Sequence, residues 1–131
     1  MLGTLKALCL SLVMLLAAAP AFAKAPAIPN SPPLKAADII KLLDGRTFSF
    51  TAYDMPLTGT ATWDSRSKSV SGNYDFSGAK GKYTADWIME GDKSCTQAPH
   101  WDKACETVYK YQNGYMEVND KGKVHAVSVP Q

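Results

Sequence analysis

Hydrophobic and polar side chains alternate along most of the chain after Arg46. The alternation recurs in four segments, which cover residues 47–53, 60–63, 69–76 and 82–90. Three later segments, residues 107–111, 115–118 and 124–129, are also rich in strand-forming residues, which gives seven strand candidates. Because successive side chains of a strand point to opposite faces, this period of two predicts strands with one buried face. Aromatic and β-branched residues, which favour strands, are frequent in these segments.

The breaks between the segments have the composition of tight turns. Asn113-Gly114, for example, favours a two-residue hairpin. Connections this short cannot contain a crossover helix, so we expect an antiparallel meander. We predict a mainly β fold, a small antiparallel β-barrel of about seven to eight strands, because closure buries the aromatic face and removes sheet edges. A two-sheet β-sandwich is the alternative.

The region before the strands has a different pattern. Leu34, Ala37 and Ile40 follow helical spacing and Asp44-Gly45 is a stop signal, so we predict one short helix over residues 34–44. It would either cover the sheet or bind a partner. Residues 24–33 contain four prolines, which disfavour a helix or a central strand and predict an extended tether.

The first 23 residues have the order of a secretory signal. Lys6 precedes an apolar run over residues 7–19, and Ala21-Phe22-Ala23 forms a small-x-small cleavage site. We therefore predict cleavage after Ala23 and a periplasmic protein. Removing 23 of the 131 residues leaves 108, enough for a single domain over residues 34–131. The apolar run is shorter than the roughly 20 residues that span a bilayer, so we expect no membrane-embedded segment.

Export also determines the state of the cysteines. Cys9 would leave with the signal, and Cys95 and Cys105 remain as an even pair in an oxidising compartment. Their spacing matches neither a C-x-x-C redox motif nor a zinc knuckle. We predict a structural disulfide and no metal site.

Charge and motifs narrow the function further. The chain has 14 basic and 12 acidic residues without a long run of either sign, which gives no support for nucleic-acid binding. Recognisable catalytic, phosphate-binding and EF-hand motifs do not occur in the sequence. His125 alternates with Val127 in the last predicted strand and is interpreted as structural. We therefore predict no enzyme activity, no catalytic residues and no cofactor.

The segment between the cysteines carries the candidate partner-binding residues, His100, Trp101 and Asp102. We expect residues 96–104 to form a loop held at both ends by the disulfide. Such a loop can present Trp101 as a rigid aromatic anchor to a partner. Alternatively, Trp101 folds back over one end of the barrel as a hydrophobic plug.

The second half of the chain has a recognisable order of glycines, aromatics and cysteines. It runs Gly81-x-Tyr83, Trp87, Gly91-Asp92, Cys95, Cys105-x-x-Val108-Tyr109, Gly114-Tyr115, Val118 and Gly122-Lys123-Val124. This order resembles a family of small exported alphaproteobacterial β-barrel proteins. Together with Asp54-Met-Pro-Leu-Thr-Gly59, it is most similar to the branch of periplasmic modulators of a nitrogen-responsive sensor histidine kinase. The resemblance implies binding to the periplasmic region of a kinase, and it implies no catalytic residues.

Three function classes follow from these observations. The first is a non-catalytic periplasmic binding or regulatory protein that acts on an envelope protein such as a sensor kinase. The second is a small-ligand carrier, which requires a cavity inside the barrel. The third is an inhibitor of an exported hydrolase, which would insert the Pro-rich segment 24–33 into an active site.

Overall fold

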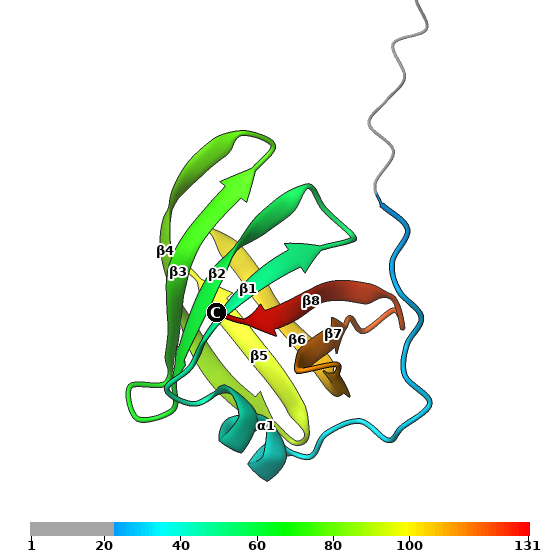
Figure 1. Ribbon diagram of the computed structural model, residues 1–131. Helices are drawn as coiled ribbons and strands as arrows, with labels where there is room; N and C mark the ends of the chain where they lie inside the picture. The colour runs from blue at the N-terminus through cyan, green and yellow to red at the C-terminus, as the bar shows by residue number, and fades with distance from the viewer. Residues whose placement is uncertain (1–22) are drawn as a thin grey trace, which may run out of the picture.

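Eight antiparallel strands close into a barrel in which each strand pairs with the next and the last pairs with the first (Figure 1). The computed structural model describes residues 23–131, so the predicted signal peptide, except for Ala23, lies outside the described residues. The strands are β1 (Thr47–Ala52), β2 (Leu57–Asp64), β3 (Ser69–Phe76), β4 (Ala79–Glu90), β5 (Lys93–Ala98), β6 (Trp101–Tyr111), β7 (Gly114–Val118) and β8 (Val124–Pro130). The predicted barrel is confirmed, and the β-sandwich alternative is not.

One part of the strand prediction is wrong. Residues 96–104, which we expected to be a loop, belong mainly to β5 and β6, with only Pro99 and His100 between these strands. Thr96 pairs with Ala104, and the disulfide joins Cys95 to Cys105, which face each other in register with their Cα atoms 4.0 Å apart. The disulfide therefore joins two strands of a hairpin, whose ladder shifts register between Thr96 and Ala98.

The helix α1 (Ala36–Leu43) closes one end of the barrel, which we call the proximal end (Figure 1). It buries Ile39 and Leu43 completely or almost so. A carboxylate oxygen of Asp92, in the β4–β5 turn, accepts a hydrogen bond of 2.9 Å from the Ala36 backbone N–H. This bond satisfies one of the backbone donors that a helix leaves free in its first turn. The predicted helix is confirmed, with a later start.

Aromatic side chains fill the proximal half of the barrel. The rings of Trp63 and Trp87 lie 5.0 Å apart, and those of Phe48 and Tyr115 lie 4.9 Å apart, both pairs edge-to-face. The indole N–H of Trp63 donates to the Tyr115 hydroxyl at 3.1 Å, and that of Trp87 donates to Ser94 Oγ at 2.9 Å. The interior thus buries large apolar rings while each buried indole N–H keeps a partner.

The Pro-rich segment lies outside the sheet and touches its outer surface. Tyr115 points into the barrel, so the next residue, Met116, points outward, yet it is 0% exposed. Ala25 packs against the cluster of Met116, Val118 and Val124. Figure 1 shows the segment, in blue, passing beside β7 and β8. Alternation along the strands does not reveal this outer contact.

Loss of the disulfide should destabilise the domain. In the chain-entropy description, the loop of ten residues between Cys95 and Cys105 corresponds to about 3 kcal/mol. In urea unfolding, the free energy of unfolding of the double variant Cys95→Ala/Cys105→Ala should fall by up to this amount. The decrease should be somewhat smaller than the full amount because the hairpin ladder remains. An unchanged unfolding midpoint would contradict a stabilising disulfide.

Deletion of residues 24–33 should also lower the free energy of unfolding, by about 1–2 kcal/mol, because it uncovers apolar surface around Met116. The matched control is Ile28→Ser, since the Ile28 side chain is 37% exposed and its loss should leave stability nearly unchanged. Thermal and urea unfolding measure both effects. Equal stability of the deletion and the full domain would show that the outer contact contributes nothing.

Candidate functional site

Polar and acidic side chains gather inside the barrel toward the end opposite α1, which we call the distal end. The β1–β2, β3–β4, β5–β6 and β7–β8 connections surround this end, and Figure 1 shows the β3–β4 hairpin projecting from it, far from α1. The proximal half is an aromatic core, whereas the distal half carries carboxylates. This contrast makes the distal end the candidate site.

Glu106 is a buried carboxylate on the inner face of β6. It stands two residues before Val108, a core residue, and pairs in register with buried Ser94. Glu106 is only 7% exposed, and its Oε2 atom has no hydrogen-bond partner. A buried polar atom without a partner is rare because it loses its hydration without compensation.

Glu117 supplies a second inward carboxylate, from β7. It stands two residues after Tyr115 and pairs with Val108 and Ala126. Glu106 is therefore its diagonal neighbour across the ladder, at the spacing that places Cα atoms about 7–8 Å apart. Within residues 23–131, neither carboxylate forms an ion pair with a lysine or arginine.

A β-bulge brings His125 to this cluster. Val118 pairs with Val124 but Glu117 pairs with Ala126, so His125 is an extra residue in β8 and the expected alternation with Val127 is interrupted there. Bulges change the direction of a side chain. The His125 Nδ1 atom lies 2.8 Å from a carboxylate oxygen of Asp54, in the β1–β2 connection. Because a carboxylate only accepts, Nδ1 carries the proton of this bond.

These four residues, Asp54, Glu106, Glu117 and His125, form what we call the acidic cluster. Burial, and after it the negative charge of Glu117, together raise the pKa of Glu106 to about 7. Burial also raises the pKa of Glu117. For His125, burial lowers the pKa, but the charges of Glu117, Glu106 and Asp54 outweigh it, so the pKa is raised overall. The cluster holds protons that the unfolded chain would release.

Two aromatic side chains stand beside the acidic cluster. The Tyr83 hydroxyl donates to the backbone oxygen of Thr60 at 2.7 Å, and its ring centroid lies 6.0 Å from that of Trp101. The charge of Glu117 acts on Tyr83, whose pKa is raised by burial and then by this charge. Trp101 remains 41% exposed. We call Tyr83 and Trp101 the aromatic pair.

The three residues predicted as partner-binding lie in the β5–β6 turn and at the start of β6. Trp101 contacts Tyr83 yet keeps much of its surface exposed, so it combines features of the plug and of the anchor. His100 lies in the two-residue turn, and Asp102 is exposed at the start of β6. Sequence analysis did not identify Glu106, Glu117 or Asp54 as site residues. The signal for Glu106 was an acid at an inward position, which becomes visible only when β6 is extended toward Trp101. Glu117 lies within the predicted strand 115–118, and Asp54 lies in a connection, outside any alternation.

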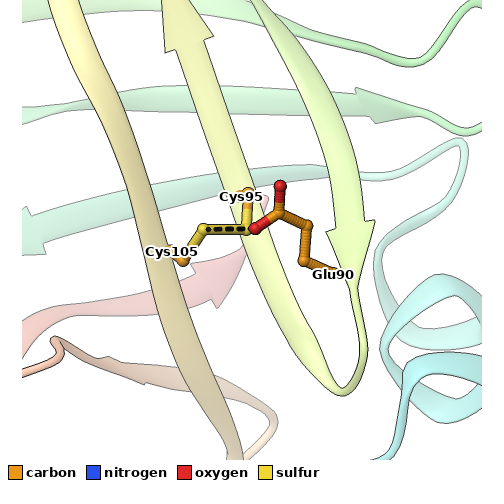
Figure 2. A group of neighbouring side chains, drawn as sticks. All are labelled: Glu90, Cys95 and Cys105. Carbon is orange, nitrogen blue, oxygen red and sulfur yellow. Dashed lines mark hydrogen bonds between the residues drawn. A yellow bond between two sulfur atoms is a disulfide. The ribbon is translucent and has the colours of Figure 1, made fainter.

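One other group of side chains has the geometry of a metal site but not the chemistry. Glu90, Cys95 and Cys105 place their ligand atoms within 4.8 Å of one another, and Figure 2 shows the Glu90 carboxylate directed toward the Cys105 sulfur. The two cysteines form the disulfide. A disulfide sulfur is not the thiolate that binds metals, so this group is not a metal site. A disulfide sulfur also has no proton to donate, so the 3.5 Å contact between Cys105 Sγ and Glu90 Oε2 is not a hydrogen bond.

No known protein family, curated protein or solved structure matches the chain. The only helix among residues 23–131 is α1, which is too short to span a bilayer. The site must therefore be interpreted from its own chemistry. It offers carboxylates without a basic partner, one histidine held by Asp54, and two aromatic faces.

The protonation of the cluster predicts how stability varies with pH. The folded state raises the pKa of Glu106 from 4.5 to about 7. Protonated Glu106 therefore stabilises the folded state at low pH, and this contribution is lost as the pH rises through about 7. The raised pKa of His125 acts in the same direction. Glu106→Gln should match wild type at about pH 5 and exceed its free energy of unfolding at about pH 8, by on the order of 3 kcal/mol at most.

The control for this comparison is Asp86→Asn, which removes a carboxylate from an exposed position of β4. It should follow the pH dependence of wild type. Thermal unfolding across this pH range measures all three proteins. If Glu106→Gln and wild type change in parallel, the account of a buried, protonated carboxyl is wrong.

Proposed function

We propose that the protein is a non-catalytic binding or regulatory protein of the periplasm, which acts on the outer domain of a membrane sensor kinase or of another envelope protein. The observation that supports this proposal is the exposed Trp101 ring, which contacts Tyr83, and the charge of Glu117 in the acidic cluster acts on Tyr83. Large aromatic residues held in place by neighbours are typical binding hot spots, because little side-chain freedom is lost when a partner docks.

The rigidity of Trp101 has two sources. The Tyr83 hydroxyl is fixed by its hydrogen bond to Thr60, and Trp101 lies at the start of β6, where it pairs with Ala98. A few residues further along β6, the disulfide holds the same hairpin. The distal end therefore presents an aromatic surface on a strand, not on a mobile loop, and strands position binding residues more accurately than loops do.

The small-ligand carrier is less well supported. Trp63, Trp87 and Tyr115 occupy the proximal interior and are almost fully buried. Two surface grooves, of about 410 and 370 Å³, border α1 on the outside of the barrel. An apolar ligand inside the barrel would have to displace this aromatic core, and the inner positions nearest the distal end carry carboxylates, which disfavour apolar ligands.

The hydrolase inhibitor is also less well supported. That function requires residues 24–33 to project and enter a cleft. Ala25 instead packs on the outer cluster around Met116, and the Leu34 backbone N–H donates to the Val108 oxygen at 2.7 Å. The segment is thus attached near both of its ends.

Photo-crosslinking in living cells tests the proposed function. A photoreactive amino acid replaces Phe76, which is 46% exposed at the end of β3 beside the distal end, and Trp101→Ala is compared with Ile88→Ala in this background. Ile88 is 48% exposed on the outer face of β4 and is the matched control. We expect one envelope protein to be captured by the parent and by Ile88→Ala, and at least tenfold less by Trp101→Ala.

Equal capture by Trp101→Ala and by the parent would contradict a binding surface centred on Trp101. Capture of no envelope protein by any of the three would contradict the proposed function as a whole. The identity of the captured protein determines whether the partner is a sensor kinase.

A further inference from the structure

We propose that the distal end binds a basic side chain of the partner, with its guanidinium or ammonium group held between the carboxylates of Glu106 and Glu117 and the faces of Tyr83 and Trp101. The inference rests on the proposed function, because it assigns the chemistry of the group that the same surface receives. Four observations support it.

The first is the unpartnered atom of Glu106. Glu106 is only 7% exposed, and among the described residues its Oε2 atom accepts no hydrogen bond. An ionised carboxylate in this position requires donors or a positive charge. Guanidinium and ammonium groups supply both at once, since they are cations and consist of hydrogen-bond donors only.

The second observation is the balance of charge around Glu106. The groups that face it are Glu117 from β7, His125 from β8, Asp54 from the β1–β2 connection and Asp120 from the β7–β8 connection. Three of these are acids, and the histidine is already bonded to Asp54. The lysines paired with acids in the described residues, Lys80 and Lys103, are bonded elsewhere. Among the described residues, the cluster therefore has no cation other than a protonated His125, which Asp54 already holds.

The third observation is the aromatic pair. A cation is attracted to the face of tryptophan most strongly, and to that of tyrosine next, when it lies within about 6 Å of the ring centroid. The exposed part of Trp101 and the half-buried ring of Tyr83 offer such faces, and the charge of Glu117 acts on Tyr83. Tyr83 thus contacts Trp101 and lies within range of the charge of Glu117.

The fourth observation favours a basic side chain over a bare metal ion as the occupant of the acidic cluster. Among the described residues, 23–131, the only group of ligand atoms close enough together to hold an ion is that of Glu90 and the disulfide cysteines. The acidic cluster does not bring three ligand atoms this close together, although His125 Nδ1 and an Asp54 oxygen lie 2.8 Å apart. A group of several atoms, such as guanidinium, bridges widely spaced acceptors, whereas one metal ion requires them at bonding distance.

Binding of blocked arginine tests the inference on the whole mature protein. N-acetyl-arginine amide is the probe, and N-acetyl-citrulline amide is its neutral, nearly isosteric control. NMR titration at about pH 8 should show saturable binding of the arginine probe, with shifts at the Trp101 indole and at Glu106 and Glu117, and at least tenfold weaker binding of the citrulline control. Equal binding of the two probes, or no saturable binding of the arginine probe, overturns the inference.

Two variants locate the site. The double variant Glu106→Gln/Glu117→Gln should bind the arginine probe about tenfold more weakly or worse. Asp86→Asn, which removes a charge from the outer wall, should bind the probe as wild type does. Because the cluster must release its protons to bind a cation, the affinity of the wild-type protein should rise at least several-fold from about pH 5 to about pH 8. This pH comparison needs no variant, so misfolding of the double variant leaves it intact. An affinity that does not rise with pH overturns the inference.

The two proposals fail in different ways. If the double glutamine variant and the parent crosslink the envelope protein equally, while Trp101→Ala does not, the partner binds but contributes no basic side chain, and this inference is overturned. If no envelope protein is captured, the proposed function is overturned. Binding of the arginine probe would then no longer indicate binding of a basic side chain from a partner protein.

Discussion

The barrel depends on the packing of Trp63 inside its proximal half. The Trp63 ring meets Trp87 at 5.0 Å and Tyr115 at 6.5 Å, and its N–H donates to the Tyr115 hydroxyl. These side chains come from β2, β4 and β7, so one aromatic cluster ties together strands that are not neighbours in the sheet. With α1 packed beneath it, this cluster supplies most of the large buried side chains. The apolar stability of the domain is therefore concentrated at one end.

That concentration leaves the other end free to carry polar groups. Inward positions near the distal end hold Glu106 and Glu117, where an ordinary small barrel would place apolar side chains. Such groups oppose folding when they are ionised, and natural proteins retain costly buried charges mainly at functional sites. The two β-bulges, one in β5–β6 between Thr96 and Ala98 and one at His125, both lie toward this end. Bulges are frequent at barrel rims and next to binding sites because they redirect side chains.

Much of the architecture could be predicted from local patterns, whereas most of the site could not. The alternation at Phe48, Val70 and Trp87 determines which face is buried, and the even number of cysteines after removal of Cys9 indicates the disulfide. The bond between His125 and Asp54 joins residues 71 positions apart and depends on a bulge. A one-residue shift of register interrupts the alternation of inward and outward side chains. A method that searches for this alternation therefore cannot detect the shift.

The contact of Ala25 with the outer face was missed for a related reason. Proline-rich composition correctly indicates that residues 24–33 do not join the sheet, but it does not show which surface they touch. Met116 has the appearance of an outward, exposed position in a strand, yet it is fully buried. Glu106 was missed because it falls between the expected loop, residues 96–104, and the predicted strand that begins at Thr107, so it had no place in the alternation.

Glu106 is a buried carboxyl group whose pKa is raised to about 7 in the free protein, and a bound cation should favour its ionised form. Titration of the Glu106 and Glu117 side-chain carbons by NMR, with and without N-acetyl-arginine amide, measures this directly. The account predicts that Glu106 titrates with a pKa of about 7 in the free protein and with a clearly lower pKa when the probe is bound. A Glu106 pKa near its ordinary value in the free protein, unchanged by the probe, would contradict it.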